Sequence, residues 1–310
     1  MQPTIRTVAY LGPPGTFTEE ALLTQPDYAG AELRLCSTIA DVLDAVAGGE
    51  VDLGFVPMEN AIDGTVSATL DALLFDVDLL VQREVVMDIH LHLMAMLGAQ
   101  LSDIVRVVSI PVALAQCEHS LRRLVPGAEH VAANSTADAA RALAEHPDAS
   151  VAALAPRVAA DLYGLELLVE DVEDHPDNQT RFVAVATSGI PAPTGHDRTS
   201  IVCFQHADRP GNLHGILGQF AARNINLTKL ESRPTKRSLG EYCFVIDLDG
   251  HLADEVVGDC LRDLHAGLAR VKFLGSYPAA GEHASMRRRK ADDAWRAADK
   301  WLQQLRVQIR

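Results

Sequence analysis

Short apolar runs alternate with helical segments from Thr7 to Val185, and this alternation constrains the fold more than any other feature of the sequence. The pattern is typical of an α/β domain with largely parallel strands. Strands are expected at residues 8–11, 33–36, 53–56, 105–109, 151–154, 165–170 and 181–186. The segments between these strands are expected to be helical.

Capping residues indicate where three of these helices begin. Thr38 can cap a helix that ends near Gly48, and Ser135 can cap a second helix. Pro111 suits the first turn of a third, because its fixed φ angle is helical and its missing N–H is not needed there. We therefore expect helices to start next to Thr38, Ser135 and Pro111.

Residues 188–197 have no hydrophobic periodicity and contain two prolines and two glycines, which is typical of a linker. We therefore predict a first domain over residues 1–187 and a second over 198–278. In the second domain, strands are expected at 200–205, 225–232, 241–248 and 270–276, with helices at 213–223 and 253–268. This βαββαβ order is the ferredoxin-like arrangement.

Residues 279–310 form a basic tail, in which positions 281–310 hold eight basic and four acidic side chains. Apolar residues recur there at spacings of three and four, which predicts an amphipathic helix. The expected partner of this helix is its own protein or a sister subunit. Binding to a membrane surface or a polyanion is the alternative.

The acidic balance excludes several classes of partner. With 42 acidic and 27 basic side chains, the formal charge is −15, which argues against nucleic-acid binding.

The apolar run at 85–97 is interrupted by charged and histidine side chains and is too short to cross a bilayer. Five cysteines without a C-x-x-C pair, and an N-terminus without signal-peptide character, predict a cytoplasmic protein with free thiols.

The loop at 12–18 follows the first expected strand and precedes a helix. Its backbone N–H groups and the positive end of the helix dipole are therefore expected to face outward, where an anion would bind well. The loop lacks the lysine of a phosphate loop and the G-x-G-x-x-G fingerprint of a dinucleotide site. An ordinary β–α turn is the alternative.

Three further strand ends carry polar side chains, and open α/β sheets bind ligands at strand ends. These are Glu59 with Asn60, Ser109 with Gln116, and Thr180 with Arg181. Glu59 could act as a base, Thr180 could donate to a departing hydroxyl, and Arg181 could hold a carboxylate with two hydrogen bonds. Taken one at a time, these residues fit solvated loops, helix caps or surface ion pairs equally well.

Two other features have a structural interpretation beside the chemical one. His90 and His92 form an H-x-H pair that an alternating strand would place on one face, but a metal needs a third ligand that the sequence does not identify. Cys117 has no basic neighbour to lower its pKa, which favours a structural thiol over a nucleophile.

Taken together, these segments resemble prephenate dehydratase, in the monofunctional bacterial form with a C-terminal ACT domain. The resemblance covers residues 7 to about 278. It rests on GPPGTFT at 12–18, PMEN at 57–60, TLDALL at 69–74, Ser109 with Gln116 and Cys117, NQTRF at 178–182, and INLTKLESRPTK at 225–236 followed by LGEY. Each motif is weak alone, but their order along the chain is specific.

The resemblance implies an α/β fold with a two-lobed catalytic domain, similar to type II periplasmic binding proteins, and a site in the cleft between the lobes. A ferredoxin-like βαββαβ ACT domain follows. The implied reaction is the decarboxylating dehydration of prephenate to phenylpyruvate, water and CO2 in L-phenylalanine biosynthesis. The resemblance implies no cofactor and no metal.

The family's site residues can be carried over where this sequence matches its motifs. The catalytic residues are then Thr180, Glu59, Asn60, Ser109 and Gln116, with Thr180 donating to the leaving hydroxyl. Thr16, Thr65, Arg181 and Phe182 are the expected substrate-binding residues.

The ACT resemblance implies feedback regulation by L-phenylalanine and assembly into a homodimer or homotetramer. The effector-binding segments would be Gly211, Asn212, Leu213 and His214, and Glu231, Ser232, Arg233 and Pro234. Asn212 and His214 replace small or apolar residues of the family pattern, so the effector affinity can differ. Two alternatives stay open, namely an arogenate dehydratase and a non-catalytic amino-acid sensor.

Overall fold

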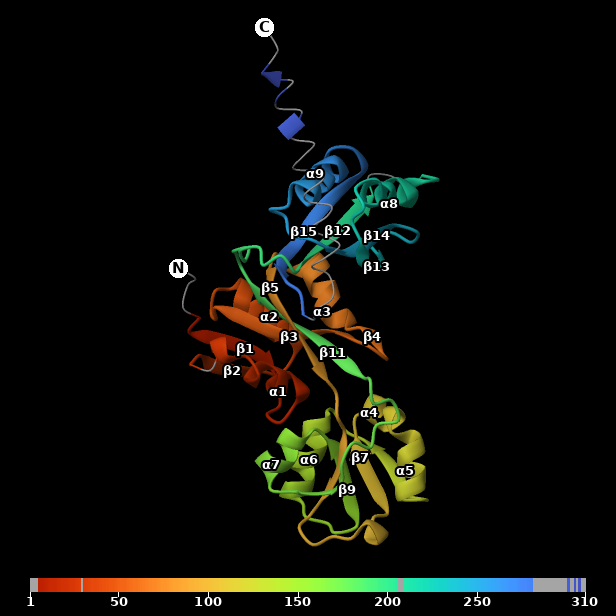
Figure 1. Ribbon diagram of the computed structural model, residues 1–310. Helices are drawn as coiled ribbons and strands as arrows, with labels where there is room; N and C mark the ends of the chain where they lie inside the picture. The colour runs from red at the N-terminus through yellow and green to blue at the C-terminus, as the bar shows by residue number, and fades with distance from the viewer. Residues whose placement is uncertain are drawn as a thin grey trace. The chain divides into compact units, whose positions relative to one another are not determined.

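The computed structural model describes residues 5–28, 30–205, 209–280, 300–301, 304 and 306–307 (Figure 1). The chain forms two compact units, one from Met1–Ala72 and Val85–Ala184 and the other from Leu73–Glu84 and Val185–Arg310. The segment Leu73–Glu84 thus belongs with the second unit. The predicted domain boundaries stay predictions, and the predicted tail helix lies largely outside the described residues.

The first lobe of the first unit is built on a sheet with strand order β2-β1-β3-β11-β5. The strands are β1 (Thr7–Leu11), β2 (Glu32–Cys36), β3 (Leu53–Asn60), β5 (Leu80–Asp88) and β11 (Gln179–Ala186), with the short β4 (Gly64–Thr65) paired to β3. β1 runs parallel to β2 and β3, and its central residues are fully buried.

One helix of this lobe, α2, begins next to Thr38 as predicted; no cap was predicted for the other two. They are α1 (Phe17–Leu23), α2 (Ile39–Ala47) and α3 (Ser67–Asp71), with a 3-10 turn at Pro26–Tyr28 and a π turn at Ala72–Asp76. Thr38 caps α2 in a capping box with Asp41, and Gly48 is the C-cap. The apolar face of α2 is buried, because Val42, Leu43, Ala45 and Val46 are at most 4% exposed.

The second lobe has a five-stranded sheet with the order β10-β6-β9-β7-β8. The strands are β6 (His92–Ala95), β7 (Arg106–Ser109), β8 (Glu129–Ala132), β9 (Val151–Ala155) and β10 (Glu166–Val169). β7 is parallel to β8 and β9, whereas β6 is antiparallel to β9 and β10. The strands are therefore only partly parallel.

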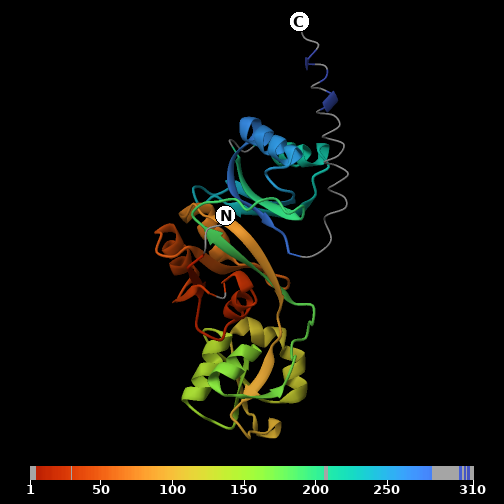
Figure 2. The same ribbon diagram turned by 60° about the vertical axis from the view of Figure 1, so that its left-hand side comes forward.

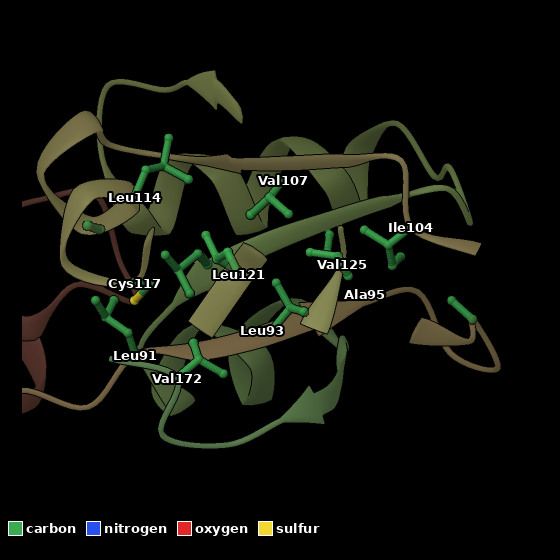
Figure 3. Packing of buried hydrophobic residues seen from close by; sticks show 14 residues of the cluster. Leu91, Leu93, Ala95, Ile104, Val107, Leu114, Cys117, Leu121, Val125 and Val172 are labelled. Atoms are coloured by element: carbon green, nitrogen blue, oxygen red, sulfur yellow. The ribbon is translucent and has the colours of Figure 1, made fainter. Parts of the chain in front are cut away.

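Helices α4 (Pro111–Gln116), α5 (Glu118–Leu124), α6 (Thr136–Glu145) and α7 (Arg157–Tyr163) complete this lobe, with a 3-10 turn at Leu101–Asp103. Pro111 occupies the first turn of α4 and Ser135 caps α6, as predicted. One apolar cluster joins α4 and α5 to the sheet (Figure 3). A second cluster packs α6 and α7 against it.

The prediction that only helices connect the seven expected strands of this unit is wrong. The seven expected strands do not include β5, β6, β8 or the two-residue β4. In β5, the run Gln82-Arg83-Glu84 breaks the apolar alternation, and in β8 most side chains are exposed because the strand lies at the sheet edge. β6 is short and buried on both faces, so it shows no alternation at all.

The chain passes between the two lobes twice, from β5 to β6 and from β10 to β11. The predicted strand carrying both His90 and His92 is broken at the first crossing, because β5 ends at Asp88 and β6 begins at His92. Even so, Nδ1 of each ring approaches Oδ1 of Asp171 on the second crossing, at 3.4 Å for His90 and 3.6 Å for His92.

The ferredoxin-like part of the second unit follows the predicted βαββαβ order. It consists of β12 (Asp197–Gln205), α8 (Asn212–Ala222), β13 (Leu227–Pro234), β14 (Tyr242–Asp249), α9 (Glu255–Asp263) with a π turn at Leu264–Leu268, and β15 (Ala269–Pro278). The sheet order is β13-β14-β12-β15, with antiparallel neighbours. β13 starts two residues later than predicted, because Asn224, at φ 54°, still belongs to the turn.

Helices α8 and α9 cover the same face of this sheet (Figure 2), where Ile216 and Phe220 pack with Ile201 and Cys203. Phe204 points to the opposite face, because side chains alternate along a strand. Its ring lies 6.4 Å from that of Phe75 in the Leu73–Glu84 segment.

The predicted fold class, a two-lobed α/β domain followed by a ferredoxin-like βαββαβ domain, is confirmed. Among the described residues, no helix combines the length and the apolar character that a membrane crossing requires.

Candidate active site

The end of β3 and the start of β11 bring together two predicted site segments that lie about 120 residues apart in the sequence. β3 and β11 are neighbours in the sheet, and Ala61 donates its backbone N–H to the Gln179 carbonyl oxygen at 2.8 Å. Glu59 and Asn60 are the last residues of β3, and Thr180 is the second residue of β11. The sheet register therefore places the two pairs of polar side chains side by side.

The Asn60 amide has one orientation that satisfies all of its neighbours. Its Oδ1 accepts the backbone N–H groups of Ile62 and Asp63 at 2.9 and 3.0 Å. Nδ2 must then be the atom that donates to Thr180 Oγ1 and to Asn178 Oδ1, each at 2.9 Å. Two backbone donors thus decide which way this side chain faces.

The Thr180 hydroxyl is held as an acceptor by this arrangement. Within the described part of the chain, its Oγ1 has one hydrogen-bond partner, Nδ2 of Asn60. A threonine hydroxyl has one hydrogen to donate, and an amide nitrogen cannot accept it. The Thr180 hydrogen therefore remains available for a ligand oxygen.

A chain of amides extends from this point into the second lobe. Asn178 Nδ2 donates to Gln116 Oε1 at 3.2 Å, and Gln116 Nε2 donates to Asp63 Oδ2 at 2.7 Å. Gln116 lies at the end of α4 in the second lobe, whereas Asp63 follows β3 in the first. Since Asp63 also donates its backbone N–H to Asn60, the four residues close a ring of hydrogen bonds.

Arg181 and Glu59 form an ion pair beside this ring. Arg181 Nη2 lies 2.8 Å from Glu59 Oε2, and their side chains are 10% and 35% exposed. The pair has little water around its cationic half, so the Glu59 carboxylate is positioned by a charge-assisted hydrogen bond. The structure thus places the Arg181 guanidinium against a carboxylate of its own chain.

Two of the predicted site residues lie inside the protein. Ser109 is 0% exposed and donates its hydroxyl to the Leu154 carbonyl oxygen at 2.6 Å, which joins the ends of β7 and β9. It is not a helix cap, since the N-cap of α4 is Ile110. Phe182 is 1% exposed and stacks on Phe55, with ring centroids 5.7 Å apart. Their roles toward substrate stay predictions.

At the loop 12–18, the carboxylate of Glu19 in the first turn of α1 lies where an external anion was expected. Glu19 accepts the Gly15 N–H and the Tyr10 hydroxyl, at 2.5 and 2.9 Å. Thr16 caps α1 by accepting the Glu19 N–H at 3.4 Å and is 9% exposed. The prediction that these backbone donors face outward is therefore wrong for Gly15.

Thr65 lies on β4, where it is the cross-strand neighbour of Glu59 on β3.

Cys117 is fully buried, and burial raises the pKa of its thiol, with Glu173 and Asp174 adding to the effect. This agrees with the structural role predicted for it.

Sequence reasoning assigned no role to Asn178 or Asp63. Asn178 could have been singled out because it lies in the NQTRF motif; the structure adds that it is 1% exposed, an unusual burial for an asparagine. Asp63 gave no such signal, since it is an exposed acid in a turn whose partner, Gln116, comes from the other lobe.

The two predicted effector segments lie on α8 and β13. Gly211 is the N-cap of α8 with φ 85°, a left-handed conformation that favours glycine, and Asn212 donates to Gln205 at 3.1 Å. Glu231 lies on β13 within 3.4 Å of both Lys229 and Arg233. Ligand contacts by these residues stay predictions.

Comparison with known proteins identifies the family. A model of the prephenate dehydratase family matches residues 8–189, and a model of the ACT domain matches residues 199–266. A prephenate dehydratase of Mycolicibacterium vanbaalenii is 42% identical over 287 residues, which are 87% of this chain and 90% of that relative.

Two solved structures are similar over most of the chain. A prephenate dehydratase from Arthrobacter aurescens in complex with L-Phe is 40% identical, with a TM-score of 0.85 over 96% of this chain and 99% of that one. GqqA, described as a novel type of quorum quenching acylase, is 30% identical, with a TM-score of 0.80 over 89% of this chain and 98% of that one.

These matches confirm the family and the enzyme class that the sequence motifs predicted. The chain belongs to the prephenate dehydratase family, in the form that carries an ACT domain after the dehydratase segment.

Proposed function

We propose that this chain converts prephenate to phenylpyruvate, water and CO2, with Thr180 as donor to the leaving hydroxyl. The observation that carries the proposal is the hydrogen bond from Asn60 Nδ2 to Thr180 Oγ1. It leaves the threonine hydrogen free for an oxygen atom of the substrate, within a site whose amides are oriented before any ligand arrives.

The reaction needs little more than orientation and charge stabilisation. The electron pair of the bond to the departing carboxylate moves into the ring, the hydroxyl leaves, and the ring becomes aromatic. A threonine hydroxyl is too weak an acid to protonate the leaving oxygen fully. Its contribution is a hydrogen bond that strengthens as negative charge develops on that oxygen, while one proton taken up from the buffered solvent lets the oxygen leave as water.

The other site residues hold the geometry in this proposal. Arg181 keeps the Glu59 carboxylate in place beside Thr180, and Gln116 ties the second lobe to the first through Asp63 and Asn178. Ligand binding that draws the lobes together would complete the site, and the ring of amides favours the closed arrangement.

Thr180→Val tests the donor role, because valine has nearly the same shape without the hydroxyl. We expect kcat for phenylpyruvate formation to fall by about 10² to 10³, the cost of losing one such donor. Thr180→Ser keeps the hydroxyl and is expected to stay within about tenfold of the unchanged protein.

Thr69→Val is the matched control. Thr69 is another buried threonine of the same lobe, and its hydroxyl donates to the Pro57 carbonyl oxygen at 2.6 Å. It is expected to lose stability but not turnover. Unchanged kcat in Thr180→Val would overturn the assignment of Thr180.

The substrate is tested with the unchanged protein, offered prephenate and arogenate in parallel. A large preference for arogenate would replace prephenate as the substrate. Turnover of neither compound by a folded protein that binds phenylalanine would favour the amino-acid sensor.

Regulation by L-phenylalanine through the ACT domain is part of the proposal, with the effector held by residues 211–214 and 231–234. It rests on the family match and on the complex of the Arthrobacter aurescens relative with L-Phe. Millimolar phenylalanine is expected to suppress turnover by favouring one conformation over another. Turnover that phenylalanine leaves unchanged would remove this part and point to Asn212 and His214.

We further propose that the chain acts in the cytoplasm as a homodimer or homotetramer. The five buried free cysteines support a reducing compartment, and ACT domains commonly pair across a two-fold axis. Light scattering of the purified protein measures the assembly, and a monomer at micromolar concentration would contradict this expectation.

A further inference from the structure

Three side chains able to ligate a metal meet where the chain crosses between the lobes of the first unit. His90 lies on the first crossing, and Asp171 and Glu173 lie on the second. Among the described residues, their potential ligand atoms all lie within 4.8 Å of one another. Neither the ring of amides nor the Arg181–Glu59 pair includes any of the three.

The spacing of these atoms fits a small tetrahedral cation. His90 Nδ1 lies 3.0 Å from Glu173 Oε1 and 3.4 Å from Asp171 Oδ1. Zinc–ligand distances of about 2.0 to 2.2 Å correspond to a tetrahedron with edges of roughly 3.4 Å. These two separations are close to that edge. The Asp171–Glu173 separation is within 4.8 Å, so the exposed Asp171 side chain would adjust to bring all three atoms into contact with one ion.

Buried neighbours fix the backbone that presents these ligands. Leu91 and Val172 are 1% and 2% exposed, lie in one apolar cluster (Figure 3), and are joined by a hydrogen bond from Val172 N to Leu91 O at 2.8 Å. Leu91 N–H also donates to Glu173 Oε2 at 2.9 Å, while Oε1 faces His90. The Glu173 carboxylate is thus oriented and only 3% exposed.

His92 orients Asp171 instead of serving as a fourth ligand. Its Nδ1 accepts the Asp171 backbone N–H at 3.1 Å, so that lone pair is in use. Asp171 has φ 50°, a left-handed conformation that aspartate and asparagine tolerate better than most residues. With His90 47% and Asp171 60% exposed, water has access to a fourth ligand position.

The local charge favours a cation. The Glu173 and Asp171 carboxylates lie 3.0 and 3.4 Å from His90 Nδ1, and Asp88 ends the strand two residues before it. Glu20, from helix α1, contributes a further carboxyl group near this ring. This group of carboxyl side chains attracts a cation.

We propose that His90 Nδ1, Asp171 Oδ1 and Glu173 Oε1 form a binding site for a divalent transition-metal cation, Zn²⁺ in preference to Mg²⁺ or Ca²⁺. One imidazole and two carboxylates with an open fourth position are a donor set that zinc accepts, whereas Mg²⁺ and Ca²⁺ prefer oxygen ligands alone. The ion would cross-link the two connections between the lobes and restrict their relative motion.

The test uses the full chain, stripped with a chelator and titrated with Zn²⁺ by calorimetry and with Co²⁺ by visible absorption. We expect one equivalent of Zn²⁺ per chain, the absorption of tetrahedral cobalt, and a higher unfolding midpoint with metal. His90→Ala is expected to weaken binding at least about tenfold and to abolish the midpoint shift.

Two further variants keep the test decisive. Asp171→Asn retains a residue suited to the left-handed backbone while removing the ligand's charge, so it is expected to fold and to bind roughly tenfold more weakly. His175→Ala removes an exposed histidine from the same connection and is expected to bind like the unchanged protein.

Three outcomes would overturn the proposal. They are no saturable Zn²⁺ binding by the unchanged protein, binding that survives both His90→Ala and Asp171→Asn, and Mg²⁺ or Ca²⁺ binding as tight as that of Zn²⁺. The first would leave an ordinary ion pair between His90 and Glu173, and the second would place the metal elsewhere.

Discussion

The substitution Asn60→Asp separates the chemical role of the hydrogen-bond ring from its structural role. The new carboxylate has the shape of the amide but cannot donate. Its oxygen would replace Nδ2, which now lies 2.9 Å from Thr180 Oγ1, and the Thr180 hydroxyl would turn to donate to it. The Thr180 hydrogen, which we propose is donated to the leaving hydroxyl, would then be donated to residue 60 instead.

Asn60→Asp is expected to lower both kcat and the free energy of unfolding. Removal of one donor of this kind lowers kcat by about 10² to 10³, or roughly 2.7 to 4 kcal/mol in the transition state. The carboxylate would also face Asn178 Oδ1 and the Gln179 carbonyl oxygen, which lie 2.9 and 3.3 Å from the present nitrogen. Acceptors facing one another are expected to cost about 1 to 3 kcal/mol in the free energy of unfolding.

The ring cannot relieve this conflict by rotating its amides. If Asn178 turned to donate to the new carboxylate, its Oδ1 would face Gln116 Oε1. If Gln116 then turned as well, its Oε1 would face the Asp63 carboxylate, which has no hydrogen to donate. Adding Asp63→Asn supplies the missing donor, so the three side-chain hydrogen bonds reverse while the backbone N–H of residue 63 still donates to residue 60.

The assay compares kcat and urea-induced unfolding for four proteins: the unchanged chain, Asn60→Asp, Asp63→Asn and the double variant. Asp63→Asn alone is expected to be nearly neutral, because an amide oxygen can still accept from Gln116. The double variant is expected to regain stability to within about 1 kcal/mol while kcat stays low. Retention of kcat within about threefold in Asn60→Asp, or recovery of kcat in the double variant, would refute the reasoning.

Other predictions follow from single contacts. Burial raises the pKa of Cys260 to about 12, and the other four cysteines are buried as well, so Ellman's reagent at pH 8 is expected to find five thiols only after unfolding. Rapid labelling of the folded protein would contradict this expectation. Burial raises the pKa of Asp174, but the backbone N–H groups of His119 and Ser120, the Ser120 hydroxyl and the charge of His119 together lower it more, so its folded pKa lies below the unfolded value. The stability it adds is present above about pH 4 and is lost as the pH falls through the folded pKa, so urea curves of Asp174→Asn and the unchanged protein should converge in acid. Gly275→Ala would place a Cβ 2.5 Å from the Val81 carbonyl oxygen at φ 145°, so a thermal melt should show a lower midpoint, and an unchanged midpoint would count against this packing.

Much of the site was predictable because its residues lie in local motifs at strand ends. Glu59 with Asn60 and Thr180 with Arg181 could be singled out from sequence, since polar side chains directly after or within the first residues of an apolar run mark the edge of a sheet. Their pairing depends on β3 and β11 being neighbours, which no local pattern specifies. The same holds for Asp63, whose partner Gln116 lies in the other lobe.

The structure adds contacts that the motifs did not indicate. Ser109 and Phe182 belong to the family motifs, but the structure turns the first toward a carbonyl oxygen of β9 and the second onto Phe55. A motif identifies which residues occur together, whereas the side of the strand that faces the core follows from the register of the neighbouring strands. β5, β6 and β8 were missed because none of them alternates between apolar and polar residues. The alternation is broken in β5, β6 is buried on both faces, and β8 is an exposed edge strand.

By itself, the sequence determined the family, the α/β class of the first unit, the βαββαβ order of the second, and the helix starts at Thr38, Ser135 and Pro111, because these depend on neighbours within a few residues. Only the tertiary structure decided the contact of Asn60 with Thr180 and the approach of His90 to Glu173. Both contacts join segments 80 or more residues apart, and their geometry is set by sheet register and chain crossings that only the packed molecule defines.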